Sequence, residues 1–264
     1  MSNLNIIDIR SQDGNIVKFE VHNTLPSTVS LAREYAKQGY PDRYVVFSER
    51  IEKSKFTGHK YSSNQRENGV FMSIILRPSL FPSQASMLGP MSAAALISGL
   101  REHTDSHLGL GWVSDLYCKG VKIGSTAIEG RLDNFTTYEY IIISFYARID
   151  NKSFPPKLND MIQKVFDTEN SSISMIIAKS ILNKFFGYYS AMKTSNKYVD
   201  ECEGSFILKD KRIKYIDNDK KSTAKIKSTA NQFTTLILEP KKGQTIELTS
   251  QNSLIMPRKV NIKR

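Results

Sequence analysis

The chain has 264 residues and is basic, with 37 Lys and Arg against 26 Asp and Glu and a formal net charge of +11. Hydrophobic residues make up 40% and charged residues 24%, which excludes a disordered or fibrous chain. No stretch reaches the roughly 18 apolar residues that a membrane span needs, and no secretion signal is apparent. The two cysteines, Cys118 and Cys202, are isolated, so neither a disulfide framework nor a thiolate metal site is predicted. We expect a folded cytoplasmic protein with no membrane partner.

The chain opens with a predicted pair of strands and a helix. Residues 3–9 and 16–22 alternate in period two around a glycine-containing turn, which is typical of paired strands. The segment that follows has apolar residues at helical spacing. Ser27 or Thr28 can cap its first turn, and Gly39 ends it.

A long polar stretch separates two predicted buried strands. The strands are YVVFSE, at 44–49, and VFMSIILRP, at 70–78. The stretch between them, 51–69, is mostly polar and contains Gly and Asn breakers. Because long loops inside a domain are usually functional or mobile, this loop is the first place to look for a ligand.

An alanine-rich helix, MSAAALISGLREH, precedes a predicted β-hairpin formed by WVSDLYC and VKIGSTAIEG. Lys119 and Gly120 form its two-residue turn, in which glycine supplies a positive φ. This register pairs Tyr117 with Lys122. Asp115 then lies on the same face as Lys122 and diagonal to it, roughly 7–8 Å away at Cβ. A carboxylate and an amine therefore share one face.

The second half predicts a strand, EYIIISFYARI, two helices at 156–167 and 172–192, and then short strands without a helix from about residue 200. The strands indicate a small β-barrel. This last part is also the basic part, since residues 201–264 hold 14 basic and 7 acidic side chains.

Several common site motifs are absent. The chain lacks the GxxxxGK[ST] phosphate loop, the GxGxxG dinucleotide motif and the GxSxG nucleophile elbow. His103 and His107 have the i, i+4 spacing of metal ligands but lack the glutamate of HExxH, so we interpret them as solvent-exposed histidines at a helix end and predict no metal site from side chains alone. Four aromatic residues at the end of the second helix are interpreted as core: Phe185, Phe186, Tyr188 and Tyr189.

Three segments together resemble the biotin–protein ligase family, within the biotin/lipoate–protein ligase superfamily. PSTVSLARE at 26–34 is similar to the family's STN-x-x-A segment, and VFMSIILRP at 70–78 to its L-Y-x-S-x-x-L-R-P strand. GWVSDLYCKGVKIGSTAIEG at 111–130 is the most specific match, to KWPNDLYxxxxKIGGILIE. The positions in register there are Trp112, Asp115, Leu116, Tyr117, Lys122, Ile123, Gly124, Ile128 and Glu129.

The resemblance implies an α/β fold of the α+β type. A mixed curved sheet with flanking helices would form a catalytic domain over residues 1–195, and a small SH3-like β-barrel would follow at 200–264. It also implies an enzyme that activates biotin, or a related acid such as lipoate or octanoate, with ATP and Mg²⁺. The acyl group would pass to a lysine of a biotin carboxyl carrier protein or a similar acceptor domain.

The resemblance also implies roles for single residues. Lys122 would neutralise the acyl carboxylate and the α-phosphate, while Asp115 would orient or deprotonate the acceptor lysine or help hold magnesium. The residues expected to bind the acyl substrate are Ser27, Thr28, Trp112, Gly124 and Ser125. Five of these residues have a structural alternative: a surface ion pair for Lys122 with Asp115, a helix cap for Ser27 and Thr28, and core packing for Trp112.

The chain departs from the family at several motifs. The family's GRGRxGRxW loop should lie within 50–61, where only Gly58, a His59-Lys60 pair and Tyr61 remain. Its GxGxN segment corresponds to Ser144–Arg148, and the asparagine of STN is replaced by valine. The basic residues of the loop are either nucleotide-binding residues that replace the missing arginines or a solvated face: Lys53, Lys55, His59 and Lys60, with Arg66.

Two other functions are considered beside the ligase. A degenerate family member would bind an acyl ligand or carrier protein without ligation. Nucleic-acid binding by the basic C-terminal quarter is disfavoured, because the ligase-like region begins almost at residue 1 and leaves no room for the N-terminal helix-turn-helix of some bacterial relatives. The basic charge is then either surface chemistry or a face for an acidic carrier domain. The sequence does not decide the acyl substrate or the oligomeric state, of which a homodimer is one option.

Overall fold

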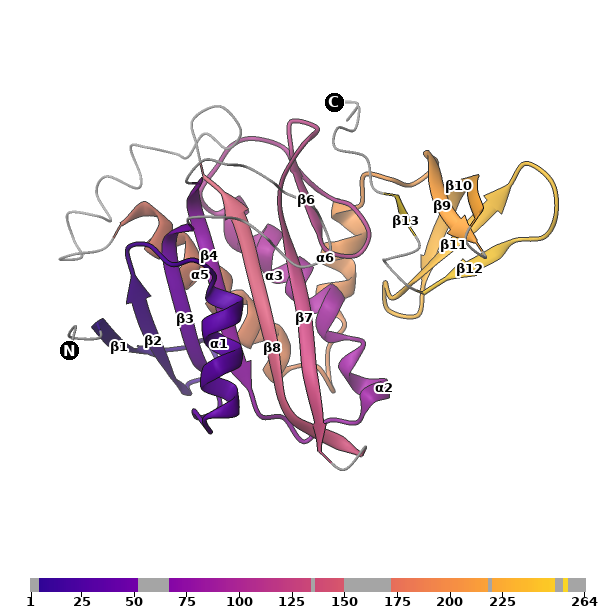
Figure 1. Cartoon of the computed structure of the whole chain (residues 1–264). Helices are drawn as coiled ribbons and strands as arrows, with labels where there is room; N and C mark the ends of the chain where they lie inside the picture. The colour runs from indigo at the N-terminus through magenta and orange to yellow at the C-terminus, as the bar shows by residue number, and fades with distance from the viewer. Residues whose placement is uncertain are drawn as a thin grey trace.

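The computed structural model describes residues 5–51, 67–133, 136–149, 172–217, 220–249 and 254–255. They form a large sheet with helices on both faces and a second, smaller sheet at the C-terminal end (Figure 1). This arrangement confirms the predicted fold class. Among the described helices, none combines the length and the apolar character that a membrane span requires.

The large sheet has eight strands in the order β1-β2-β3-β4-β8-β7-β6-β5. All neighbours are antiparallel except β2 and β3, which are parallel because the chain crosses over through helix α1 between them. The strands are β1 (Asn5–Arg10), β2 (Ile16–His22), β3 (Tyr44–Ile51), β4 (Glu67–Leu76), β5 (Leu108–Leu110), β6 (Asp115–Cys118), β7 (Val121–Asp133) and β8 (Thr137–Arg148).

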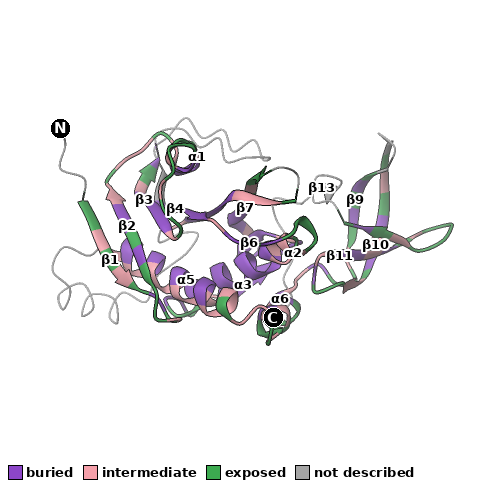
Figure 2. Cartoon of the chain, turned by 90° about the horizontal axis from the view of Figure 1, so that it is seen from below, coloured by how far each residue is buried: buried purple, intermediate pink, exposed green. Residues whose placement is uncertain are grey.

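Helix α1 (Thr28–Lys37) covers one face of this sheet, and α3 (Leu88–Arg101) and α5 (Ile173–Ser190) cover the other (Figure 2). Ala32 and Ala36 of α1 are buried against β3, β4 and β8, because small side chains let the helix approach the sheet closely. On the opposite face, Gly99 of α3 lies against α5, where an added Cβ would come within 2.7 Å of the Ile181 Cα. The short helix α2 (Pro82–Ala85) precedes α3.

Most predicted elements of the first 192 residues are present. Ser27 caps α1 by accepting a hydrogen bond from the Ser30 amide, and the hairpin between β6 and β7 has the predicted Tyr117–Lys122 pair. The aromatic residues Phe185 and Phe186 are fully buried in α5, which confirms that they belong to the core. The helix predicted over 156–167 lies outside the described residues.

The prediction of strands without a helix from residue 200 is wrong at its start, because helix α6 spans Lys197–Ser205. This helix packs on α3 and β5, with Tyr198 and Cys202 on its buried side. The two residues are spaced i, i+4, but the helix has no side-chain N-cap and ends near Gly204, so only tertiary packing identifies it.

The smaller sheet is antiparallel, with the strand order β12-β11-β10-β9-β13. Its inward side chains, including Ile213 and Ala224, continue the main hydrophobic core. The strands are β9 (Arg212–Asp217), β10 (Lys220–Ala230), β11 (Thr235–Pro240), β12 (Ile246–Leu248) and β13 (Leu254–Ile255). The domain boundary between residues 195 and 200 stays a prediction.

Asp13, in the turn between β1 and β2, is expected to make the stability of the fold sensitive to acid. Its carboxylate accepts a 2.7 Å hydrogen bond from the Arg43 guanidinium, which also lies over the Phe186 ring. Burial would raise the pKa of Asp13, but hydrogen bonds from Ser11, Arg43 and Asn15 outweigh it and lower the pKa to about 2. Since this pKa is lower than in the unfolded chain, the stabilisation is present above about pH 4 and is lost as the pH falls toward 2.

We expect Asp13→Asn to lower the free energy of unfolding by about 1–2 kcal/mol at pH 6 and to have a much smaller effect near pH 2. Urea unfolding of both proteins between pH 2 and pH 6 measures the difference, in which the titration of all other carboxylates cancels. Parallel pH curves for the two proteins would contradict the assignment.

Candidate active site

The face of the large sheet that carries α1 also carries a row of side chains from four strands. Asp115 of β6 lies opposite Ser125 of β7, which lies opposite Tyr146 of β8, which in turn lies opposite Phe71 of β4. Each of these side chains is at most 5% exposed. The row crosses the sheet beside the N-terminus of α1, since Thr28 contacts the neighbouring row.

Lys122 and Asp115 form a buried ion pair at the end of this row. The Lys122 Nζ lies 2.6 Å from the Asp115 Oδ1, and the side chains are 5% and 0% exposed. The interpretation as a surface ion pair is therefore wrong. A bulge at Ile123 shifts the register, so that Asp115 pairs with Ser125 and both share a face with Lys122.

One oxygen of the Asp115 carboxylate can still accept a hydrogen bond or ligate a cation. Its Oδ2 is buried and has no hydrogen-bond partner among the described residues. A buried oxygen without a partner is costly, so such an atom marks a place where a donor or a cation from a ligand would be stabilised. The pair thus combines a fixed cation with an oxygen that can accept a proton or ligate a metal.

Three hydroxyl groups continue the polar surface toward α1. The Ser73 Oγ donates to the Thr28 Oγ1 at 2.9 Å and lies 3.0 Å from the Ser144 Oγ. All three side chains are buried. The capping and substrate-binding interpretations of the Ser27-Thr28 pair are compatible, because Ser27 caps the helix while the Thr28 hydroxyl points to the sheet.

Gly124 and Ser125 have different roles in the hairpin. Ser125 lies on the candidate face between Asp115 and Tyr146. Gly124 permits close contact with β8, because an added Cβ would lie 2.2 Å from the Tyr146 carbonyl oxygen. The structure therefore gives Gly124 a packing role, and its contact with substrate stays a prediction.

Trp112 lies in the hydrophobic core, where it is 1% exposed. Its indole Nε1 donates a 2.9 Å hydrogen bond to the carbonyl oxygen of Phe233, in the turn between β10 and β11. Of the two interpretations of this residue, the structure supports core packing. Trp112 thereby joins the segment before the ion pair to the smaller sheet.

Sequence reasoning missed two features of this face. Ser73 and Ser144 are single serines within otherwise apolar strands, a pattern that could have marked them. Arg33 of α1 forms two 2.7 Å hydrogen bonds with the Glu129 carboxylate of β7, which raise the pKa of Arg33. This ion pair links α1 to β7 on the same face of the sheet, further along the strands than the three hydroxyl groups.

The other predicted ligand positions are placed as follows. Lys53, Lys55, His59, Lys60 and Arg66 lie outside the described residues. Within the described part of the chain, no group of three or more His, Cys, Asp or Glu side chains is arranged to hold a metal.

The two helix-end histidines are not alike. His103 is 2% exposed and lies 2.8 Å from the Ser180 Oγ, whereas His107 is exposed. Their common interpretation as solvent-exposed side chains is therefore wrong for His103. Its imidazole packs against α5, which the spacing along the sequence could not indicate.

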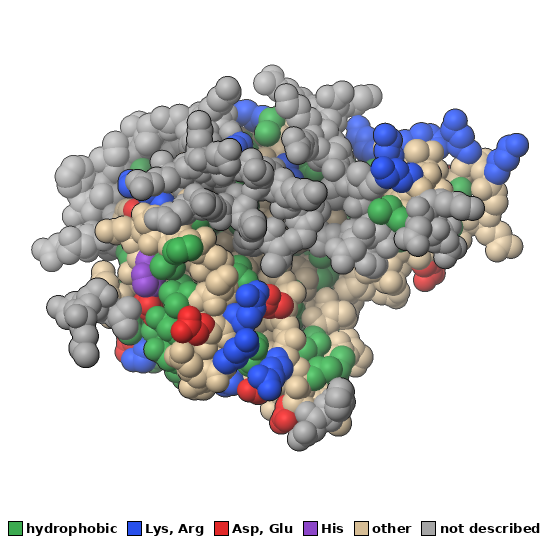
Figure 3. Space-filling view, viewed as in Figure 1, with side chains coloured by type: hydrophobic (Ala, Val, Ile, Leu, Met, Phe, Trp, Pro, Cys, Tyr) green, Lys and Arg blue, Asp and Glu red, His purple; other side chains and the backbone are tan. Residues whose placement is uncertain are grey.

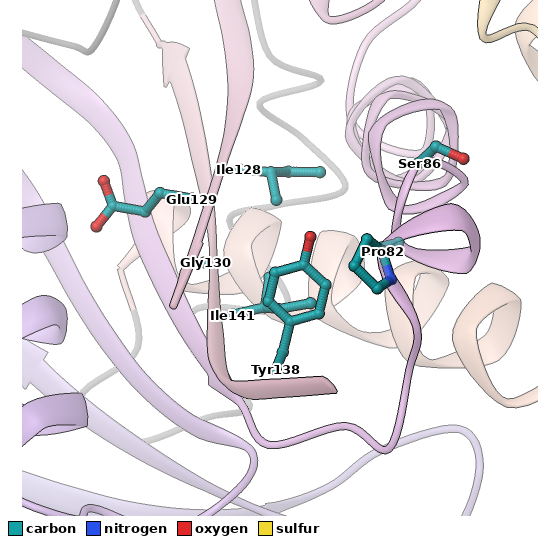
Figure 4. A pocket seen from close by; sticks show the side chains of 8 residues that line it. Pro82, Ser86, Ile128, Glu129, Gly130, Tyr138 and Ile141 are labelled. Carbon is teal, nitrogen blue, oxygen red and sulfur yellow. The ribbon is translucent and has the colours of Figure 1, made fainter. Parts of the chain in front are cut away.

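A cavity of about 270 Å³ lies elsewhere, where α2 faces β7 and β8 (Figure 4). The Tyr138 ring fills the space beside Gly130, and the Glu129 side chain points away from the cavity. Its lining residues are Pro82, Ala85, Ser86, Ile128, Glu129, Gly130, Tyr138 and Ile141. Because none of them belongs to the ion pair or the hydroxyl groups, this cavity is separate from the candidate site.

No protein-family model matches the chain. The chain is 26% identical over 141 residues to the bifunctional ligase/repressor BirA of Bacillus subtilis (strain 168), which covers 53% of this chain and 43% of that protein. It is 22% identical over 152 residues to BirA of Bacillus spizizenii, covering 57% and 47%. The chain thus matches less than half the length of these curated relatives.

Solved structures share the fold over most of the chain. The biotin protein ligase from Aquifex aeolicus has a TM-score of 0.64 at 13% identity, covering 90% of this chain and 98% of that one. A biotin protein ligase-like protein of unknown function from Silicibacter sp. TM1040 has a TM-score of 0.63 at 12% identity, covering 91% and 97%. The chain therefore has the fold of the biotin protein ligases and distant sequence similarity to them.

Proposed function

We propose that this chain is an ATP-dependent ligase that activates biotin or a related carboxylic acid and transfers the acyl group to a lysine of a carrier protein. The observation that carries the proposal is the buried Lys122–Asp115 pair, which faces the same side of the sheet as Ser125 and the α1 N-terminus. One solved structure of the same fold, the Aquifex aeolicus ligase, is a complex with biotin and ATP, with a TM-score of 0.63 at 14% identity.

In the first step, a carboxylate oxygen of the acid attacks the α-phosphorus of ATP, and pyrophosphate leaves. Two anions must approach each other, so the reaction needs a fixed cation between them. Lys122 supplies this charge, and its burial strengthens the interaction because little water screens it. The hydroxyl groups of Thr28 and Ser125 bind polar atoms of the acid.

In the second step, the acceptor lysine amine attacks the carbonyl carbon of the acyl-adenylate, and AMP leaves. The amine loses a proton in this step, and the Asp115 Oδ2 is a buried acceptor with no other partner among the described residues. The same oxygen has the ligand chemistry that Mg²⁺ prefers. Mg²⁺ would neutralise phosphate charge, with Asp115 as one of its ligands.

Acid-dependent exchange between ATP and labelled pyrophosphate tests the proposal, because it reports the first step without a carrier. Biotin, lipoate and octanoate are tested separately on the full chain. We expect exchange with one of these acids and none without an acid. A folded protein that shows no exchange with any of them would refute ligase activity with these substrates.

A second candidate is a member of this fold that binds an acyl ligand without chemistry. It is favoured by Phe71 and Tyr146, whose rings lie 5.3 Å apart on the candidate face and are nearly fully buried. These side chains reduce the space that an acyl group can occupy there. Calorimetric binding of one acid by a protein without exchange activity would select this candidate.

A further inference from the structure

The outer face of β9 and β10 is strongly basic. Ile213 and Tyr215 of β9 point into the core, so the alternate residues Arg212 and Lys214 are exposed on the other side. We define the basic face as the cationic side chains on this side of both strands, of which four are exposed and Lys225 is half-buried: Arg212, Lys214, Lys221, Lys225 and Lys227. In Figure 3, Lys and Arg side chains gather over the smaller sheet.

The charges of the basic face are poorly balanced within the chain. Arg212 lies directly opposite Lys225, an arrangement of like charges that destabilises a sheet. Lys225 is itself paired with Asp210 at 2.7 Å and lies opposite the exposed Glu239 of β11. Within the described part of the chain, no ion pair is formed by Arg212, Lys214, Lys221 or Lys227. The four cations without an ion pair leave this surface with an excess of positive charge, which an anionic partner would neutralise.

The composition of the face favours an acidic protein surface over a nucleic acid. Single-stranded nucleic acids are bound by exposed aromatic rings that stack on bases, but Tyr215 is 4% exposed and points inward. The basic face instead adds the exposed Ile216 and Thr223 to its cations. Cations mixed with an apolar and a hydroxyl side chain on the surface of a sheet fit a folded acidic domain.

The basic face belongs to a sheet that is joined to the candidate site. Phe233, which follows β10, accepts the hydrogen bond from Trp112, and Trp112 lies three residues before Asp115. A folded domain of about 100 residues has a radius of gyration of about 13 Å. A partner domain of that size, bound with one residue at the candidate site, would therefore extend well beyond the site.

We propose that the basic face docks the acidic surface of the carrier domain whose lysine receives the acyl group. This inference rests on the proposed ligase function. Complementary charge of this kind steers the carrier and raises the association rate, and its effect decreases with salt. The basic face takes no part in the activation of the acid.

The test compares two double variants with the same change of charge. Lys214→Glu/Lys221→Glu reverses the basic face, whereas Lys241→Glu/Lys242→Glu reverses two exposed lysines after β11. The probe is a fluorescently labelled, acidic biotin carboxyl carrier domain, whose binding is measured by anisotropy at 20 and 200 mM salt. Circular dichroism confirms that both variants are folded.

We expect the first variant to weaken carrier binding about tenfold or more at low salt and to lose most of the salt dependence. The second should change binding less than about twofold. Both should keep the acid-dependent pyrophosphate exchange of the wild type. Equal effects of the two variants, or no effect of either, would overturn the docking proposal.

The outcomes separate this inference from the proposed function. Charge-dependent carrier binding by a protein without exchange activity would keep the docking surface and refute the ligase. Exchange activity in a protein whose carrier binding is unchanged by charge reversal of the basic face would support the ligase and refute the docking surface. A labelled 20-base-pair DNA duplex is measured in parallel, and binding of the duplex but not of the carrier domain would overturn the proposal in favour of nucleic acid.

Discussion

Replacing Lys122 by methionine is expected to lower acid-dependent pyrophosphate exchange by a factor of about 10²–10³ or more. The loss follows from the removal of the buried cation that lies beside the Asp115 carboxylate on the candidate face. The substitution should also destabilise the fold by about 3–5 kcal/mol, because it leaves the buried Asp115 charge without its partner. Exchange kinetics and urea unfolding measure the two effects separately.

The double variant Lys122→Met/Asp115→Asn is the matched control for stability. Because it removes both buried charges, we expect it to recover most of the lost free energy of unfolding while it stays inactive. Such a result would assign the loss of exchange to chemistry and not to unfolding. Wild-type exchange in this stable double variant would contradict the role of Lys122.

Replacing Trp112 by alanine is expected to lower the free energy of unfolding by about 3–5 kcal/mol. The substitution removes a fully buried ring and leaves the Phe233 carbonyl oxygen without its donor. Because Trp112 is the single tryptophan of the chain, unfolding must be followed by circular dichroism and not by indole fluorescence.

Trp112→Phe separates packing from hydrogen bonding at this position. It keeps an aromatic ring but loses the bond to Phe233, so we expect a smaller cost of about 1–2 kcal/mol. A cost below about 1 kcal/mol for Trp112→Ala, together with weaker binding of the acid, would show instead that the ring is a wall of the substrate site.

Local features of the candidate site were predictable from the sequence. The Lys119-Gly120 turn fixes the pairing of Tyr117 with Lys122, since a two-residue turn leaves one register. The helix cap is equally local, because the Ser27 hydroxyl accepts its hydrogen bond from the Ser30 amide, three residues further along the chain. The resemblance in the same hairpin then indicated which of its polar residues to consider for catalysis.

Other features depend on contacts between distant segments. The bulge at Ile123 places Ser125 opposite Asp115, although a regular hairpin would have placed Gly124 there. Arg33 and Glu129 are 96 positions apart, and the Trp112 and Phe233 partners are 121 apart. Periodicity carries no information about such pairs, which only the packing of α1 and of the smaller sheet brings together.

Most strands and helices, the register of the β6–β7 hairpin and the shared face of Lys122 and Asp115 could be predicted from the sequence, because turns, caps and apolar periodicity act over a few residues. The short strand β5 and helix α6 could not. The burial of the Lys122–Asp115 pair, the place of Trp112 in the core and the contact of Ser73 with Thr28 and Ser144 depend on how distant segments pack together. Burial is a property of the assembled layers, since a side chain on a strand is exposed or enclosed according to what packs on that face.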